Sequence, residues 1–394
     1  MPIDLARARA DTPTCERLLH FNNAGAALMP LSVLDAVKRH LDREAAIGGY
    51  EAAEEVRDRH EAVYDSVARM LSCAREEVAL VENATVAWQL AFHSLALGPG
   101  DRVLTATSEY ASNYIAFLQL QRSRGIEIAA VPDDADGALD VEALARMIDG
   151  RTKLIAVTHV PTNGGLVNPV AAIGRVARDH GIPYLLDACQ SVGQMPIDVA
   201  AIGCDFLSAT GRKYLRGPRG TGFLYVRRAM LDRVEPPFID LRGARWAAPD
   251  RYELRPDARR YENWESYLAG QLGLGVAIDY ALGWSLEAIE GRVTSLAASL
   301  REALGGIGGV IIRDLGRRRC GIVSFTLGGV GSRDIVARLR GQAINASGSS
   351  PSSTLLDATR RGLPDLVRAS VHYYNSEAEI ERFAAAISAI AAAR

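Results

Sequence analysis

Short apolar runs alternate with helical segments between residues 78 and 210, and this alternation constrains the fold more than any other feature. The runs expected to form strands are residues 78–81, 102–107, 126–131, 153–160, 182–188 and 205–210. Most segments between them carry apolar residues three and four positions apart, which is the spacing of an amphipathic helix. Strands that alternate with helices form βαβ units, in which helices cover both faces of a mainly parallel sheet. The pattern therefore predicts an α/β fold.

The segments outside this stretch predict two further parts of the chain. Residues 220–226 read as one more strand, reached without an intervening helix. Residues 236–260 are polar, contain Pro and Gly and lack periodicity, so we expect an extended loop that ends a large domain. Helices are expected over 31–47, 52–71, 268–289, 332–341 and 376–394, and further strands over 321–327, 342–347 and 368–374. The expected limits are an N-terminal arm at 1–20, the large domain at 21–265 and a smaller α+β domain at 266–394.

Composition excludes several other classes of protein. The 394 residues carry 45 Lys and Arg against 47 Asp and Glu, a net charge of −2, so the basic character of a nucleic-acid-binding protein is missing. The five cysteines are scattered, so neither a disulfide scaffold nor a structural zinc site is expected. There is no apolar run of about 18 residues and no signal-peptide pattern, so we expect a cytoplasmic protein without a membrane segment.

Polar residues stand at three places where an expected strand ends. They are Asn83-Ala84-Thr85, Asp187 and the turn from Thr210 to Lys213. Parallel sheets bind ligands at the carboxyl ends of their strands, so these groups are expected to lie close together. A lysine that forms an imine and a carboxylate that keeps a pyridinium nitrogen protonated are the groups that pyridoxal phosphate (PLP) requires. Asp187 and Lys213 therefore predict a PLP site.

Three segments carry a resemblance to a known family. They are residues 187–226 (DACQSVGQMPIDVAAIGCDFLSATGRKYLRGPRGTGFLYV), 158–174 and 368–380. They resemble the class V aminotransferase family, whose best-known members are the cysteine desulfurases and selenocysteine lyases, and the likeness runs from about Phe21 to Ile390. The resemblance implies PLP fold type I, with a large domain on a mostly parallel seven-stranded sheet flanked by helices, and PLP as the cofactor.

The resemblance also implies roles for the residues around the cofactor ring. Lys213 would carry the cofactor as an imine and move the Cα proton of the substrate. Asp187 would pair with the ring nitrogen, and Gln190 would contact the phenolic oxygen. Tyr110 stands where many desulfurases have a histidine, so its ring would stack on the cofactor.

The phosphate of the cofactor has its own expected partners. Ala84 and Thr85, at a helix N-terminus, would bind it because exposed N–H groups and the helix dipole favour an anion there. Thr210 would also hold the phosphate, and Arg212 would add a charged contact.

On the substrate side the resemblance implies three residues. Arg368 would clamp the substrate carboxylate, for which a guanidinium fork has the right geometry. Asn23 and Thr162 would also face the substrate. In the segment THVPTNGGL either Thr162 or Asn163 replaces the asparagine usual at this place.

The greatest departure from the family lies at residues 345–356. Desulfurases carry a catalytic cysteine on a mobile loop there, whereas this segment contains none. Cys189 and Cys320 are expected to be packing residues, as small buried cysteines commonly are. Persulfide chemistry is therefore not expected. β-Elimination needs only a good leaving group and one base, and Lys213 can be that base.

Residues 346–375 look most like the ergothioneine-pathway lyases that act on hercynylcysteine sulfoxide. This resemblance implies a PLP-dependent C–S β-lyase that releases a sulfur product, pyruvate and ammonia. An aminotransferase, an epimerase of the isopenicillin N type and a cysteine desulfurase-like protein stay open as alternatives, and a non-catalytic partner protein is the second class of hypothesis. The family is dimeric, and residues 259–270 stand where one subunit completes the phosphate site of the other, so a homodimer is expected.

Overall fold

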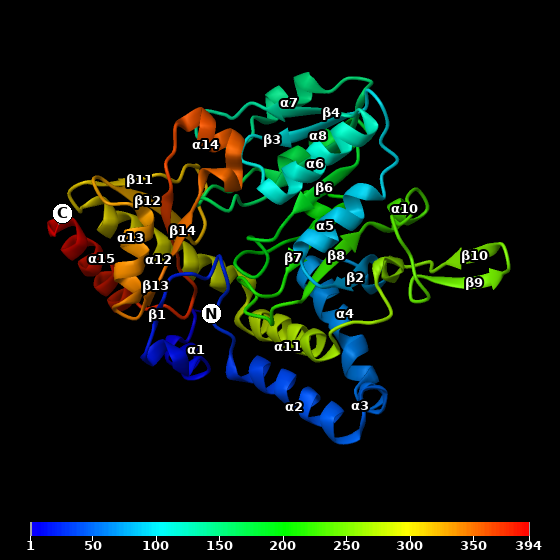
Figure 1. Cartoon of the computed structure of the whole chain (residues 1–394), viewed down its shortest axis with the longest axis horizontal. Helices are drawn as coiled ribbons and strands as arrows, with labels where there is room; N and C mark the ends of the chain where they lie inside the picture. Colours follow the sequence, from blue (N-terminus) through cyan, green and yellow to red (C-terminus); the bar gives the residue numbers. More distant parts are fainter. Residues whose placement is uncertain (1, 394) are drawn as a thin grey trace.

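A seven-stranded sheet lies at the centre of the larger part of the molecule (Figure 1). The structure, a computed structural model, describes residues 2–393. The strands are β2 (Val78–Val81), β3 (Arg102–Ala106), β4 (Glu127–Val131), β5 (Thr152–Thr158), β6 (Tyr184–Asp187), β7 (Phe206–Thr210) and β8 (Gly222–Val226), in the order β2-β8-β7-β6-β5-β3-β4. Only the two pairings of β8 are antiparallel. The expected α/β fold with a mostly parallel sheet is confirmed.

Helices cover both faces of this sheet because successive residues of a strand point to opposite sides. They are α5 (Ala84–His93) and α6 (Ala111–Arg124) on one face, and α4 (Arg57–Leu71), α7 (Val141–Met147), α8 (Val170–Asp179) and α11 (Leu268–Trp284) on the other. Leu185 of β6 packs in the apolar cluster of α5 and α6, whereas Leu186 packs in the cluster of α8 and α11. The strands are therefore mostly apolar, as expected of a sheet covered on both faces.

A smaller sheet lies in the C-terminal part of the chain. Its strands, in the order β11-β12-β15-β14, are β11 (Val310–Ile312), β12 (Ile322–Leu327), β15 (Leu366–Ser370) and β14 (Ser347–Ser349), and all its pairings are antiparallel. The helices of this part are α12 (Leu286–Gly305), α13 (Ser332–Arg340), α14 (Leu355–Arg361) and α15 (Glu377–Ala392).

The N-terminal segment packs against this C-terminal part. β1 (Leu19–His20) pairs in parallel with β13 (Ile344–Asn345), and Asn22 forms a bridge with Ser370 at the end of β15.

The remaining helices are α1 (Leu5–Ala10), α2 (Leu31–Ile47), α3 (Gly49–Glu55), α9 (Val199–Ile202) and α10 (Arg228–Leu231). The domain limits proposed at residues 20 and 265 stay a prediction.

The expected loop at residues 236–260 is wrong in its second half. That half forms a hairpin of β9 (Ala244–Ala248) and β10 (Arg251–Leu254), which projects from the body of the molecule (Figure 1). None of their residues is buried, and the exposed side chain of Trp246 stands directly opposite that of Tyr252. A hairpin with little buried surface needs no alternation of apolar and polar residues, so periodicity gave no signal.

Two of the expected long helices are broken. The helix expected at 268–289 ends at Trp284 and resumes at Leu286, because Ser285 has a left-handed φ of 70° and its hydroxyl accepts from Ala288 N at 3.3 Å. The helix expected at 52–71 is divided between α3 and α4 at Val56.

Across residues 2–393 no single helix is both long enough and apolar enough to span a membrane. The bent pair α11 and α12 meets these two criteria only when its helices are taken together.

Candidate active site

The carboxyl ends of β6 and β7 bring Asp187 and Lys213 into one site. Asp187 is the last residue of β6, and Lys213 lies in the turn that follows β7. The amine of Lys213 contacts the thiol of Cys189, two residues beyond Asp187. Lys38 and Lys153 are the only other lysines of the chain, and both are exposed, whereas Lys213 is half-buried.

The surroundings of Lys213 favour its neutral amine. Burial lowers its pKa, Cys189 opposes this effect, and the charges of Arg212 and Arg368 add to it. A neutral amine is the form that adds to an aldehyde. The arrangement therefore suits a lysine that carries an aldehyde cofactor.

Asp187 is held by one donor on each carboxylate oxygen. Its Oδ1 accepts from Cys189 N at 2.8 Å, and its Oδ2 accepts from Asn113 Nδ2 at 2.9 Å. Burial raises the pKa of this carboxyl, while the hydrogen bonds from Asn113 and Cys189 lower it. An oriented, buried carboxylate is a strong partner for a cationic ring nitrogen.

Gln190, Thr210 and Arg212 lie around the same two strand ends. Gln190 donates from Nε2 to Ala24 O at 3.2 Å, and its buried Oε1 has no partner among residues 2–393. Thr210 is buried and its hydroxyl donates to Thr221 O at 3.3 Å. Arg212 donates to Gly25 O, so its guanidinium is engaged by the N-terminal segment. The unpaired end of Gln190 is a polar atom that only a ligand or water can satisfy.

The start of α5 has the character of an anion site. Asn83 caps the helix by accepting from Val86 N at 3.0 Å, and Ala84 and Thr85 are its first two residues, of which Thr85 is exposed. N–H groups in the first turn of a helix have no acceptor within the helix. Gly222 at the start of β8 permits the close approach of this turn, since a Cβ there would lie 2.8 Å from Asn83 Cα.

Arg368 is a buried guanidinium without a carboxylate partner. Its Nη1 donates to the carbonyl and the hydroxyl of Thr162, both at 2.9 Å, and its Nε donates to Ser347 Oγ at 3.2 Å. No ion pair joins it to an acid within the described part of the chain. Its charge acts on Lys213 and it lies within reach of Tyr110. A buried cation of this kind is a receptor for an anionic group such as a carboxylate.

Substitution of Arg368 by lysine is expected to raise KM for an amino-acid substrate about tenfold or more. Lysine keeps the charge but loses the planar fork, so at least one charge-assisted hydrogen bond disappears. Steady-state kinetics test this, with Arg313→Lys as the control because Arg313 also bonds a threonine hydroxyl of the small sheet, that of Thr326. An unchanged KM in Arg368→Lys would contradict the role in substrate binding.

Asn23 does not join this set. It is fully buried, its Nδ2 donates to Ser370 O at 2.7 Å and His20 O at 3.2 Å, and its Oδ1 accepts from the Tyr374 hydroxyl. Both N–H groups of its amide serve the junction between the N-terminal segment and β15, and its oxygen already accepts one hydrogen bond. A substrate contact through Asn23 stays a prediction.

The alternatives Thr162 and Asn163 are separated by their contacts. Thr162 binds Arg368, as described above, whereas Asn163 binds the segment in which desulfurases carry their cysteine. Asn163 Nδ2 donates to Thr354 Oγ1 at 2.9 Å and Ser350 O at 3.3 Å, and its Oδ1 accepts from Ser349 Oγ. The serine-rich segment is therefore anchored beside the substrate side of the site.

Sequence reasoning assigned no role to two residues that contact or support Asp187, Glu109 and Asn113. Both are buried and hydrogen-bonded to each other at 2.9 Å. One signal was available, because Glu109 follows the strand at residues 102–107 at the same edge of the sheet where Asp187 ends its strand.

The residues at this edge fit PLP. The half-buried lysine and the oriented carboxylate correspond to the aldehyde and the ring nitrogen of that cofactor. The unpaired oxygen of Gln190 corresponds to its phenolic oxygen, and the first N–H groups of α5 to its phosphate. Fold and site together define a PLP-dependent enzyme of fold type I.

Comparison with known proteins identifies the family. The chain belongs to the aminotransferase class-V family, whose sequence profile matches residues 19–383. It is 33% identical to a probable cysteine desulfurase of Xylella fastidiosa, over 98% of this chain and 95% of that protein. It is 31% identical to a cysteine desulfurase of Serratia proteamaculans, over 99% of both chains. The apo structure of a cysteine desulfurase from Thermococcus onnurineus NA1 matches with a TM-score of 0.93 at 27% identity, over 100% of this chain and 99% of that one.

These relatives bear on the expected reaction. They support the coarse expectation of a PLP-dependent enzyme with cysteine-desulfurase-like character. They favour the desulfurase alternative over a lyase for hercynylcysteine sulfoxide, since the names of these relatives contain no link to ergothioneine synthesis.

Proposed function

We propose that this enzyme cleaves the C–S bond of cysteine or an S-substituted cysteine by β-elimination. The observation that carries the proposal is that residues fitting PLP lie together in a chain without a cysteine at residues 345–356. Burial raises the pKa of all five cysteines, to about 11 for Cys15 and Cys320 and about 12 for Cys73, with Cys189 and Cys204 also raised. Nucleophilic cysteines have a lowered pKa because the thiolate is the reacting form.

The segment at residues 345–356 supports the same conclusion. Serines occupy it, and Asn163 binds Ser349, Ser350 and Thr354 at once. β14 in this segment pairs with β15, with Ser347 opposite Arg368. The segment is a fixed wall of the substrate side and carries no sulfur that could accept one from the substrate.

Each residue of the site has a separate role in the proposed elimination. When bound, PLP supplies a sink for the electrons of the broken Cα–H bond. Arg368 binds the substrate carboxylate, and Lys213 Nζ takes the Cα proton as general base. Asp187 holds the proton on the ring nitrogen. The electron pair of the Cβ–S bond leaves with sulfur, which takes up a proton. The released enamine takes up one water to yield pyruvate and ammonia.

The second candidate is a cysteine desulfurase, which the sequence relatives favour. That reaction transfers the sulfur to a thiol nucleophile and leaves alanine as the carbon product. Within the elimination reading, a sulfoxide such as hercynylcysteine sulfoxide stays a proposal for the substrate, because a sulfenate is a better leaving group than a thiolate, amine or alkoxide.

Product analysis distinguishes these candidates. The purified holoenzyme is given L-cysteine, an S-alkyl cysteine and its sulfoxide, without any 2-oxo acid, and pyruvate, ammonia and alanine are measured. We expect pyruvate and ammonia in a one-to-one ratio, with the sulfoxide the fastest substrate. Alanine as the main product from cysteine would establish the desulfurase instead, and dependence on an added 2-oxo acid would establish a transaminase.

We further propose that the enzyme acts as a homodimer. Several large apolar side chains around one cavity of about 460 Å³ are exposed: Tyr50, Phe238, Trp264 and Tyr267. Glu82 and Val86, which flank the expected phosphate turn, line the same cavity. Burial of such a patch by a second copy agrees with its size and apolar character. Sedimentation of the purified protein tests this, and a monomer at micromolar concentration would contradict it.

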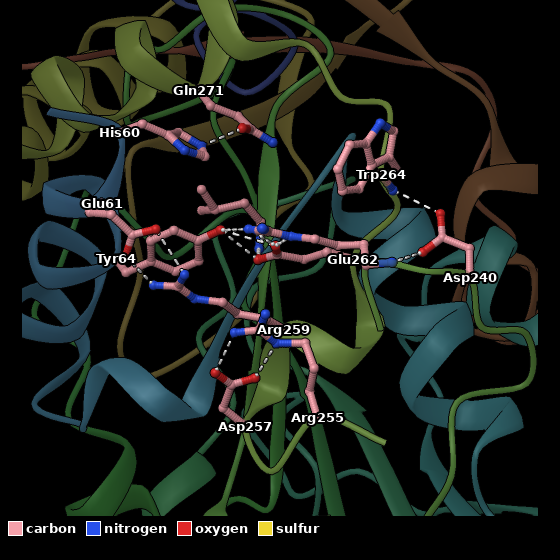
Figure 2. Close-up of polar contacts among 12 residues, drawn as sticks. His60, Glu61, Tyr64, Asp240, Arg255, Asp257, Arg259, Glu262, Trp264 and Gln271 are labelled. Atoms are coloured by element: carbon pink, nitrogen blue, oxygen red, sulfur yellow. Dashed lines mark hydrogen bonds and ion pairs between the residues drawn. The ribbon is translucent and has the colours of Figure 1, made fainter. Parts of the chain in front are cut away.

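Partly buried ion pairs and hydrogen bonds lie next to these exposed side chains (Figure 2). Glu262 accepts from Tyr64 at 2.8 Å and pairs with Arg242 at 3.0 Å. Arg259 lies over the ring of Tyr64, 3.7 Å from its centre, and pairs with Glu61 at 2.6 Å. The charged side chains of Arg259 and Glu262 therefore anchor residues 259–264, which are expected to reach the partner subunit. The side chain of Trp264 is exposed.

A further inference from the structure

Two buried residues behind the cofactor site, Glu109 and Asn113, have no part in the reaction described above. Glu109 follows β3 and is 3% exposed, and Asn113 lies in the first turn of α6 and is 2% exposed. A buried carboxyl costs free energy unless its partners compensate for the lost water. The partners of this pair all lie at the edge of the sheet that carries Asp187.

Asn113 joins two carboxylates through one amide group. Its Nδ2 donates to Glu109 Oε1 and to Asp187 Oδ2, each at 2.9 Å. Together with Cys189 N on Oδ1, this places one donor on each oxygen of Asp187 and sets the plane of its carboxylate. The lone pairs of Asp187 that remain for a ligand are therefore oriented by Asn113.

Glu109 is held in turn by donors from three elements. Its Oε2 accepts from Thr158 N at 3.0 Å and Thr105 Oγ1 at 3.1 Å, and its Oε1 accepts from Tyr110 N at 2.8 Å and from the Thr158 hydroxyl. Backbone N–H and amide NH₂ groups only donate, so the cage matches a side chain that only accepts. Burial raises the pKa of Glu109 to about 7, and the hydrogen bond from Thr158 opposes this effect.

The position of Glu109 in the sheet explains why its hydrogen bonds connect several elements. Thr158 ends β5 and stands directly opposite Asp187 in the register of β5 and β6. Tyr110 is the N-cap residue of α6. One carboxylate thus fixes the backbone before α6, the end of β5 and, through Asn113, the acid at the end of β6.

We propose that Glu109 and Asn113 are positioning residues for the cofactor. Asn113 orients Asp187 toward the ring nitrogen, and Glu109 holds both Asn113 and the turn from which Tyr110 covers the ring. The inference rests on the proposed placement of PLP between Asp187 and Tyr110. It concerns how the ring is held and is independent of which bond of the substrate breaks.

The test compares Asn113→Ala and Glu109→Gln with wild type and with Asp205→Asn. Asp205 is a matched control because it is a largely buried carboxylate at the opposite end of β6, where it accepts from Tyr184 N at 2.8 Å. The cofactor-free full chain is titrated with PLP to obtain a dissociation constant. The circular dichroism of the bound cofactor in the visible region reports a fixed ring orientation, and thermal unfolding of the cofactor-free chain reports the fold.

Both variants are expected to raise the dissociation constant of PLP about tenfold or more, the effect of losing one hydrogen bond to a charged group. They are also expected to lose most of the visible dichroism, while Asp205→Asn keeps both properties. Glu109→Gln carries the test alone if Asn113→Ala does not fold, since it preserves volume and turns one acceptor of the cage into a donor.

Two outcomes would overturn the inference. One is wild-type affinity and dichroism in both variants. The other is a lower unfolding temperature of the cofactor-free chain with unchanged properties of the bound cofactor, which would show a purely structural role. A wild type that binds PLP but releases no pyruvate would overturn the proposed function instead and leave this test intact.

Discussion

Replacement of Lys213 by alanine is expected to reduce turnover at least about 10³-fold and to remove the covalently bound cofactor. The same amine attaches the cofactor and moves the Cα proton, and a positioned general base alone contributes about 10² to 10⁴-fold. Borohydride reduction of the wild type followed by peptide mass spectrometry is expected to find the cofactor on the peptide that contains Lys213, and no labelled peptide in the variant.

Lys153→Ala is the control for this prediction. Lys153 is exposed, and its amine donates only to Gly150 O at 2.8 Å, so its removal is expected to leave the labelled peptide and the rate unchanged. Label on a peptide other than that of Lys213, or near-normal turnover in Lys213→Ala, would contradict the assignment of Lys213 as the lysine that binds the cofactor.

Asp187→Asn is expected to lower kcat about 10²-fold or more. Asparagine keeps the shape of the side chain and can still accept from Cys189 N, but it lacks the charge that holds a proton on the ring nitrogen. Removal of one such electrostatic group from a buried site costs about 10² to 10³ in rate. Rapid-quench or steady-state measurement of pyruvate release gives kcat, and the visible spectrum shows whether the cofactor is still bound.

The control and the contrary result are equally specific. Asp205→Asn changes a carboxylate at the other end of the same strand and is expected to retain kcat. A kcat near that of wild type in Asp187→Asn, with the cofactor bound, would mean that another group protonates the ring and that Asp187 only shapes the pocket.

Much of the fold followed from local patterns. Residues 31–47 were expected as one helix and form α2 over that range, and the six expected strands between residues 78 and 210 all occur in the large sheet. Patterns failed where a single residue changed the backbone, as at Ser285, whose left-handed φ of 70° separates α11 from α12. They also failed for β9 and β10, because an exposed hairpin leaves no periodic trace.

Some residues of the candidate site could also be predicted from the sequence, and others could not. Asp187, Lys213 and Thr210 were found because each stands at the end of an apolar strand, and parallel strands bring such ends together. Glu109 and Asn113 were passed over because their role depends on an amide that bridges to Asp187, 74 residues further along the chain. Asn23 was assigned to the substrate, yet its amide serves a contact with Ser370, 347 residues away.

By itself the sequence determined the alternation of strands and helices, the polar residues at the strand ends and the absence of a cysteine from residues 345–356. Those features depend on spacing along the chain, which is legible without coordinates. Tertiary structure alone decided which polar groups keep a free donor or acceptor for a ligand. Asn23 and Arg368 are both buried and polar, but neighbours that meet only in the folded chain take both N–H groups of one and leave the guanidinium of the other without a counter-ion.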